Sequence, residues 1–253
     1  MSESIRAVER ALDVLMCFSS QTPELTMTQI SEMVGINKST VHRLLATLEG
    51  KRFVERDAVT GVYRPGIRLL QMAFLTLDQN NLRRLAAPFL HTLCELYREN
   101  VNLSVLDDTD VVYLDVIEST QRVKLAAAPG QRLPAYCTAS GKAILAFLPE
   151  DKVREILAHG MQKHTQNTYT SIEAFFEDIS CTREQGYAIS EQEFEDGINA
   201  IAAPICNHPI ASVSIAGPAY RLTRQRMIEI GPNLVAIVKK IAQEIEVANN
   251  FKR

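Results

Sequence analysis

The nine residues Asn37-Lys38-Ser39-Thr40-Val41-His42-Arg43-Leu44-Leu45 decide how the N-terminal part of this 253-residue chain folds. Asn37 is a good helix N-cap, because its side-chain oxygen can accept a hydrogen bond from an early backbone N–H. The spacing i, i+3, i+4, i+7 then predicts the buried face of a helix, made of Val41, Leu44, Leu45 and Leu48. The remaining face is polar and basic at its start, with Lys38, Ser39, Thr40, His42 and Arg43.

A shorter helix is predicted immediately before this one. Thr26 and Gln29 have the spacing of a capping box, and Gly35 is a natural end for the helix that they open. A further helix at about residues 5–18 precedes both, with an expected buried stripe of Val8, Ala11, Leu12 and Leu15. Two short helices joined by a glycine turn, the second with a polar and basic start, are typical of a helix-turn-helix.

The polar start of the second helix has the chemistry of a DNA-recognition helix. Arg, Ser, Thr or His in this place can reach base edges, while Lys and backbone N–H groups hold phosphates. Residues 53–64 then predict two short strands about Thr60-Gly61, which is the wing of a winged helix. The predicted DNA contacts are Thr28, Lys38, Ser39, Thr40, His42, Arg43, Arg56 and Arg64. Alternatives stay open, since such units also serve as protein-interaction modules, and Ser39, Thr40 and His42 can instead serve the helix start or the packing.

The distribution of charge agrees with a DNA-binding region, although the whole chain is acidic. Its formal net charge is −3 and its pI is about 6.0, which by themselves speak against nucleic acid. Residues 1–84, however, carry 11 basic and 9 acidic side chains, whereas residues 85–253 carry 16 and 21. Within residues 35–64, six basic side chains stand against three acidic ones. The acidity therefore belongs to the C-terminal part, and the predicted DNA-reading segment is locally basic.

The segment 25–66 resembles the DNA-binding domain of the IclR-type transcriptional regulators. That family has a Lys/Pro-Ser-Thr-x-x-Arg-Leu-Leu run followed by a Thr-Gly-x-Tyr wing. The matching residues are Ile30, Gly35, Lys38-Ser39-Thr40-Val41-His42-Arg43-Leu44-Leu45, Leu48, Val54, Thr60-Gly61 and Tyr63. Pro65 departs from the family, which usually has Leu before the glycine. The resemblance covers nearly the whole chain and implies a transcriptional regulator, more often a repressor than an activator, that binds double-stranded operator DNA.

An apolar helix is predicted between the two halves of the chain, with a stripe of Ile67, Leu70, Phe74 and Leu77. Packing within its own chain is one explanation of this stripe, and dimerisation is the other. The resemblance favours dimerisation, because in that family this helix links the domains and dimers form about the DNA-binding region. We therefore expect a homodimer or homotetramer. Three parts are predicted: a winged helix-turn-helix at 1–65, a linker and dimerisation helix at 66–84, and an effector-binding domain at 85–253.

The C-terminal part is predicted to mix strands with helices. Residues 101–105 and 112–116 alternate as an antiparallel hairpin, and residues 123–128 are expected to add a third strand. An apolar period from Met227 to Ile245 predicts a closing helix, interrupted at Gly231-Pro232. The resemblance implies a GAF-like domain here. The expected fold class is thus α+β and multidomain, with an N-terminal winged helix-turn-helix, a linker helix and a C-terminal GAF-like effector-binding domain.

Small residues at 138–141 open a predicted helix in this domain. Free N–H groups at such a start suit a carboxylate, although small residues can also merely permit close packing. The stretch matches the family pattern Thr-x-x-Gly-Lys-Ala-x-Leu-Ala, which there forms part of the effector pocket. Carried over by position, the resemblance implies that a small organic acid is bound by Cys137, Thr138, Ala139, Ser140, Gly141, Glu191, Ala200, Ser212 and Ser214. The family often has Asp at the position of Glu191, and Ser or Thr at that of Ala216.

Other classes of protein find little support in the sequence. It has no apolar run of about 18 residues and no signal-peptide core, so we expect a cytoplasmic protein that does not bind membranes. The five cysteines include no Cys-x-x-Cys pair, which argues against a disulfide framework or a structural zinc site. Cys137, Ser140 and Lys142 could suggest an enzyme, but the sequence has no nucleophile-elbow motif, no His-Glu-x-x-His motif and no diagnostic spacing of histidines. A metal-dependent sensor stays open, since scattered Cys and His can meet in space. We expect no catalytic residue, no cofactor and no metal ligand.

Overall fold

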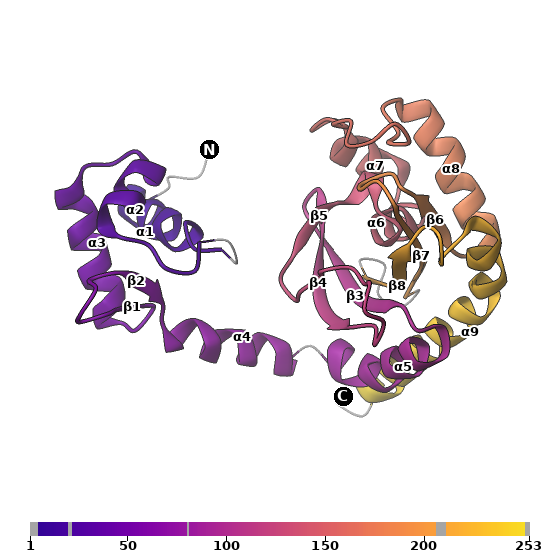
Figure 1. The fold of residues 1–253 in the computed structure, drawn as a ribbon, viewed down its shortest axis with the longest axis horizontal. Helices are drawn as coiled ribbons and strands as arrows, with labels where there is room; N and C mark the ends of the chain where they lie inside the picture. The colour runs from indigo at the N-terminus through magenta and orange to yellow at the C-terminus, as the bar shows by residue number, and fades with distance from the viewer. Residues whose placement is uncertain (1–4, 20–21, 80, 206–210, 251–253) are drawn as a thin grey trace. The chain divides into compact units, whose positions relative to one another are not determined.

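The structure is a computed structural model that describes residues 5–19, 22–79, 81–205 and 211–250. Its contacts divide the chain into two compact units, Met1–Asn80 and Asn81–Arg253. The N-terminal unit is mainly helical, and in the C-terminal unit helices surround one large sheet (Figure 1). Each unit has its own hydrophobic core.

The N-terminal unit is a winged helix-turn-helix. Its elements are the helices α1 (Arg6–Met16), α2 (Met27–Val34), α3 (Lys38–Gly50) and α4 (Ile67–Gln79), and the antiparallel wing strands β1 (Val54–Arg56) and β2 (Tyr63–Pro65). Thr26 and Gln29 form the predicted capping box, and Gly35 ends α2 with a φ of 70°. The side chain of Asn37 accepts a hydrogen bond from the backbone N–H of Thr40. The local signals that predicted α2 and α3 are thus confirmed.

The predicted buried stripe of α1 is wrong in part. Val14 and Cys17 are buried at this helix, whereas Val8 and Leu12 are 54% and 55% exposed. The apolar residues of α1 form two overlapping faces, and the face that contains Val14 is the one that packs on α2 and α3. Periodicity alone does not choose between the two faces, because the choice depends on the neighbouring helices. The other face forms an exposed apolar stripe made of Ile5, Val8, Leu12 and Met16.

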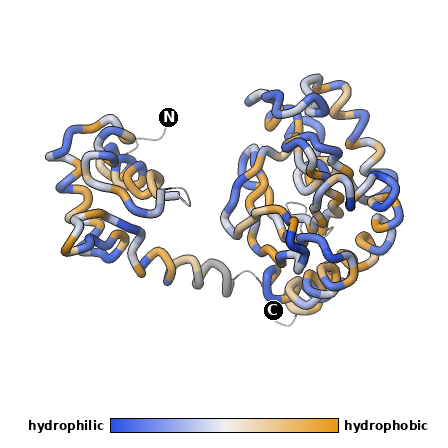
Figure 2. The backbone as a smooth tube through the Cα atoms, viewed as in Figure 1, coloured by the Kyte–Doolittle hydropathy of each residue, from blue (hydrophilic) through white to orange (hydrophobic). Residues whose placement is uncertain are grey.

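Six antiparallel strands form one sheet in the C-terminal unit, in the order β5-β4-β3-β8-β7-β6. They are β3 (Asn100–Asp107), β4 (Asp110–Ile117), β5 (Arg132–Pro134), β6 (Ala188–Glu191), β7 (Ile198–Pro204) and β8 (Ala211–Pro218). Helices α5 (Asn81–Tyr97) and α9 (Arg224–Asn250) pack on one face through the larger core. Hydrophobic and hydrophilic residues alternate along both helices (Figure 2), as expected for helices with one buried side.

The other face of the sheet carries α6 (Ala139–Leu145). The short 3-10 helix η1 (Ala135–Cys137) leads into α6, and α7 (Glu150–Leu157) and α8 (Ile172–Gln185) share a second core with both. Where α6 packs, this sheet face carries mostly small side chains: Ala188, Ser190, Ala200, Ala202, Ser212, Ser214, Asn102 and Ser104. Small side chains let α6 lie close to the strands and position its first turn over the sheet.

The expected third strand is wrong in position. Residues 123–128 form no strand, and the strand that pairs with β4 is β5, at Arg132–Pro134. The chain turns at Gly130, whose φ is 85°, and pairing starts only after this turn. Before the turn, the side chain of Asn100 donates a hydrogen bond to the carbonyl of Leu125 and so holds the segment outside the ladder.

The expected interruption of the last helix is also wrong, because α9 runs without a break through Gly231-Pro232. Proline removes one backbone hydrogen bond from a helix. Ile230 and Leu234, on either side of this pair, are buried in the core, and their packing holds the helix together. Gly231 lies against the ring of Tyr187, where an added Cβ would stand 2.4 Å from a ring carbon.

Candidate functional site

The start of α3 presents most of the predicted DNA contacts to solvent. Lys38, Ser39, His42 and Arg43 are exposed at this end of the helix, while Thr40 and Thr28 of α2 are half-buried. The Ser39 hydroxyl donates a hydrogen bond of 2.9 Å to the Asn37 side chain, so it also belongs to the helix cap. Lys38, His42 and Arg43 thus give the start of α3 an exposed surface that bears nitrogen atoms.

The wing supplies two more exposed cations, Arg56 and Arg64. The Arg64 Nε lies 3.4 Å from a carboxylate oxygen of Glu55, a surface pair that contributes little to stability and leaves the guanidinium accessible. The guanidinium of Arg56 lies 5.7 Å from the centre of the Tyr63 ring. Hydrogen bonds from the backbone and hydroxyl of Thr60 hold the pKa of Asp57 below its usual value and fix the wing turn.

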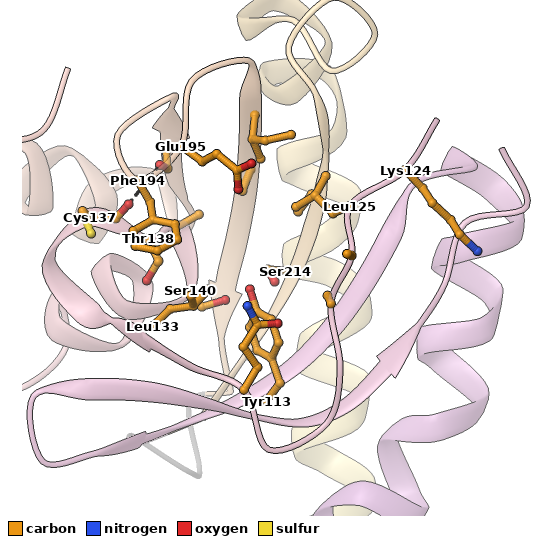
Figure 3. Close-up of a pocket in the computed structure, with 18 residues that line it drawn as sticks. Tyr113, Lys124, Leu125, Leu133, Cys137, Thr138, Ser140, Phe194, Glu195 and Ser214 are labelled. Carbon is orange, nitrogen blue, oxygen red and sulfur yellow. Dashed lines mark hydrogen bonds between the residues drawn. The ribbon is translucent and has the colours of Figure 1, made fainter. Parts of the chain in front are cut away.

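A cavity of about 240 Å³ opens in the C-terminal unit between the first turn of α6, the sheet and two loops (Figure 3). Six of the nine predicted effector residues line it: Cys137, Thr138, Ala139, Ser140, Ala200 and Ser214. They come from η1, α6, β7 and β8, which lie far apart in the sequence. The family pattern around residue 138 therefore marks a wall of a real cavity.

The other three predicted effector residues do not line the cavity but support its walls. Gly141 lets α6 approach η1, because an added Cβ would lie 2.1 Å from the carbonyl oxygen of Ala135. The Ser212 hydroxyl donates a hydrogen bond of 3.2 Å to the backbone carbonyl of Ser140. Glu191 forms an ion pair with Arg224 at the start of α9.

Most of the remaining wall was not predicted. It consists of Tyr113, Lys124, Leu125, Ala126, Ala127, Gln131, Leu133, Ser190, Phe194, Glu195, Ile198 and Ala216. The segments 124–127 and 194–198 are brought to the cavity by the tertiary fold. No pattern in their local sequence predicts that they line it. Tyr113 lies in a predicted strand. Its large polar side chain within an alternating apolar segment is the sequence feature that could have marked it as a residue of the site.

Neutral hydroxyl groups dominate the polar chemistry of this cavity. Ser214 accepts a hydrogen bond of 3.3 Å from the Asn102 side chain, and Ser140 accepts one of 3.2 Å from the Ser104 hydroxyl. Both serine hydroxyls thus keep their own hydrogen for a ligand. Burial raises the pKa of Tyr113 to about 12, so its phenol also remains a neutral donor.

Two charged residues contribute to the described wall, Lys124 and Glu195. The Lys124 ammonium lies 2.5 Å from a carboxylate oxygen of Glu118 and points away from the centre of the cavity (Figure 3). A bound anion would therefore depend on hydroxyl and backbone N–H donors rather than on a buried cation.

Cys137 is poorly suited to nucleophilic catalysis. Its side chain is fully buried, and burial, aided by the negative charge of Glu193, raises the pKa of the thiol to about 12. Reactive cysteines have lowered pKa values and are partly exposed. Cys137 is therefore a packing residue of the cavity wall.

We expect Cys137 to resist alkylation by iodoacetamide at pH 8, since almost none of it is thiolate there. Cys181 is exposed and should be modified, and Cys94, buried with a raised pKa, is a matched unreactive control. Mass spectrometry of proteolytic peptides after a timed reaction measures each site. Alkylation of Cys137 as fast as Cys181 in the folded protein would contradict this account of the thiol.

A winged helix-turn-helix followed by a domain with a small-molecule cavity defines the class of transcription factors that carry their own sensor. Comparison with known proteins gives the family. The IclR helix-turn-helix domain matches residues 7–58, and the C-terminal domain of bacterial IclR transcriptional regulators matches residues 74–247. The chain belongs to the IclR family of transcriptional regulators.

Relatives cover almost the whole chain. KipR of Bacillus subtilis is 33% identical and covers 97% of each chain, and the repressor IclR of Escherichia coli is 31% identical over 96% of this chain and 90% of its own. Among solved structures, an IclR regulator from Alicyclobacillus acidocaldarius is 27% identical, with a TM-score of 0.84 and coverage of 95% and 98%. The domain order and fold predicted from the sequence are thus confirmed.

Among the described residues, no helix is long and apolar enough to cross a membrane. Within the same residues, no group of three or more His, Cys, Asp or Glu side chains is arranged to hold a metal ion.

Proposed function

We propose that this regulator is a repressor whose operator binding is changed by a small organic acid in the cavity beside α6. The cavity itself is the observation that carries the proposal, since Tyr113, Ser140 and Ser214 direct neutral donors to a space of about 240 Å³. Pockets for drug-sized ligands measure about 300–1,000 Å³. A compact acid of few carbons suits the smaller space, with its carboxylate toward these donors and the first N–H groups of α6.

Binding, rather than turnover, is the proposed role of this cavity, so we regard the protein as a non-enzyme. The buried thiol of Cys137 has a pKa of about 12 and would not act as a nucleophile near neutral pH. A protein that binds operator DNA works in the cytoplasm, where bacterial DNA lies. We retain the division into DNA reading by 1–65, linkage by 66–84 and effector binding by 85–253.

We also propose that DNA contacts are made by Lys38, Ser39, Thr40, His42, Arg43, Arg56, Arg64 and Thr28, and that two copies act together. The exposed stripe of α1 (Ile5, Val8, Leu12 and Met16) and exposed apolar residues of α4 (Ile67, Leu70, Met72 and Leu75) support self-association of the N-terminal unit. A two-fold dimer would present two recognition helices to two half-sites of an operator. The proposed assembly is a homodimer or a homotetramer.

Replacing Leu12 by Glu should weaken self-association at least about tenfold, because it places a charge in the proposed apolar interface. Sedimentation at several protein concentrations measures this, and operator affinity should fall with it. Val123→Glu, at an exposed apolar residue of the C-terminal unit, is the matched control and should change neither. An unchanged association constant for Leu12→Glu would remove α1 from the interface.

A thermal-shift screen of small organic acids on the full chain tests the proposed ligand class. A ligand that binds the folded state raises its Tm as the ligand concentration exceeds Kd. Ser214→Ala should weaken the binding of a hit about 3- to 10-fold, the cost of one hydrogen bond of about 1 kcal/mol. Ser180→Ala, at an exposed serine of α8, is the control. The proposal fails if no acid raises the Tm. If the Ser214→Ala variant binds the acid as tightly as the parent does, Ser214 does not contact the ligand.

A further inference from the structure

One of the large, fully buried side chains of the C-terminal unit is that of a lysine. Lys142, the fourth residue of α6, is 0% exposed. Its ammonium lies 2.6 Å from a carboxylate oxygen of Glu193 and 2.9 Å from one of Asp178, and 5.2 Å from the centre of the Tyr169 ring. Lysine is almost never fully buried without such partners. These contacts join α6 to α8 and to the connection between β6 and β7.

Stability alone does not explain this cluster. Buried charged groups lose their hydration when the protein folds. Well-packed apolar residues of similar volume therefore often stabilise a protein as much as a buried ion pair does, or more. Here two carboxylates share one ammonium, and the second carboxylate oxygen of Glu193 has no hydrogen-bond partner among the residues that the structure describes. Burial raises the pKa of Glu193, while Lys142 opposes that rise. We therefore explain the ion pair of Lys142 and Glu193 by the relative position of α6 and the β6–β7 connection that it fixes.

Glu193 leads directly to the ligand cavity. It lies in the β6–β7 connection immediately before Phe194 and Glu195, whose side chains line the cavity (Figure 3). The backbone of this connection turns sharply at Gln192, which has a φ of 56° in the left-handed region. Hydroxyls of the segment 165–168 donate hydrogen bonds of 2.6 Å to the backbone carbonyls of Gln192 and Glu193.

Lys142 lies in α6, the helix whose first residues form another wall of the same cavity. Ala139 and Ser140, three and two residues before Lys142, line the cavity. One ammonium therefore connects the helix that forms one wall to the loop that forms another. The 165–168 segment fixes the loop backbone, whereas Lys142 fixes the loop relative to α6.

We propose that Lys142 is a positioning residue, which holds the β6–β7 connection against α6 so that Phe194 closes the ligand cavity. This inference rests on the proposed function in one respect, which is that the cavity binds a ligand. The position of the loop can be measured without any ligand.

The chain contains no tryptophan, so Phe194→Trp in the full chain places a single fluorescent reporter on the loop. Lys142→Met on this background should release the loop, raise the acrylamide quenching constant at least about twofold and shift the emission to longer wavelength. Lys152→Met is the matched control. That lysine is 62% exposed on α7, pairs with Glu155 at 2.6 Å, and should leave the emission unchanged.

Two further variants separate positioning from general loss of stability. Val213→Ala removes two methyl groups from the opposite core and should lower Tm without changing the quenching of Trp at 194. Glu193→Gln keeps an acceptor for the Lys142 ammonium, so its acrylamide quenching constant should equal that of the Phe194→Trp parent. Glu193→Leu removes the acceptor, so its quenching constant should equal that of Lys142→Met. If Lys142→Met does not fold, the two Glu193 variants decide.

Parent-like quenching in folded Lys142→Met or Glu193→Leu protein would overturn the positioning role. So would an equal rise in Val213→Ala, because the change would then follow stability. Neither result depends on a ligand. A failed search for an organic acid would instead remove the proposed effector and leave the role of Lys142 in the loop intact.

Discussion

Arg43→Ala is expected to weaken binding to operator DNA about 10- to 100-fold, the cost of roughly 1–3 kcal/mol for one lost base contact. Arg43 is exposed on the solvent side of α3, and its side chain forms no ion pair among the described residues. Its guanidinium is therefore free for a base edge or a phosphate. The substitution removes no core contact, so Tm should change little.

Fluorescence anisotropy on operator and on random DNA separates the two kinds of contact for Arg43. Loss of a base contact lowers the preference of the protein for operator over random DNA. Loss of a phosphate contact instead lowers the affinity for both DNAs equally and reduces the salt dependence of binding. Arg154→Ala is the matched control, because Arg154 is an exposed arginine of α7 that pairs with Glu150. Unchanged affinity and preference in Arg43→Ala would show that α3 does not read DNA through this residue.

Gly141→Ala should destabilise the C-terminal unit by about 3 kcal/mol or more, at the upper end of the cost of overpacking. The new Cβ would lie 2.1 Å from the carbonyl oxygen and 2.3 Å from the Cα of Ala135, and these backbone atoms cannot rotate away as a side chain could. Either α6 or η1 must move, and both form walls of the cavity. We therefore expect the response to an effector to be lost together with the stability.

Thermal unfolding by circular dichroism measures the effect of Gly141→Ala, with an expected drop in Tm of roughly 6–12 °C for a chain of this size. Gly50→Ala is the control. Among the described residues, its added Cβ would meet no atom within 4 Å other than its chain neighbours and its own helix backbone, and alanine is favoured within helices. Its Tm should be unchanged or slightly raised. A Gly141→Ala protein that melts within 2 °C of the parent would mean that α6 and η1 are further apart than described.

The helices of the DNA-reading unit could be predicted because their signals are local. The Thr26 and Gln29 capping box, the glycine at 35 and the Asn37 cap each act within one helical turn. The buried face of α1 could not be predicted in the same way. Val8 and Val14 are equally apolar, and only the packing of α2 and α3 decides that Val14 is buried.

About a third of the residues that line the cavity could be predicted, for a similar reason. The residues at 137–140 form one continuous stretch, so one pattern found them together. Phe194 and the segment 124–127 reach the same cavity through separate loops. The buried contact between Lys142 and Glu193 spans 51 residues of chain, and nothing in either local sequence indicates the partner.

The most direct test of the whole account is the affinity of the full chain for DNA upstream of its own gene, measured by anisotropy at several salt concentrations, with and without the acid found by thermal shift. We predict that this DNA is bound at least about 1,000-fold more tightly than random DNA of equal length. Affinity should fall as salt rises, and the acid should change it at least about fivefold, a typical coupling between two sites. Equal affinity for both DNAs, unaffected by the acid, would contradict a ligand-responsive operator-binding regulator.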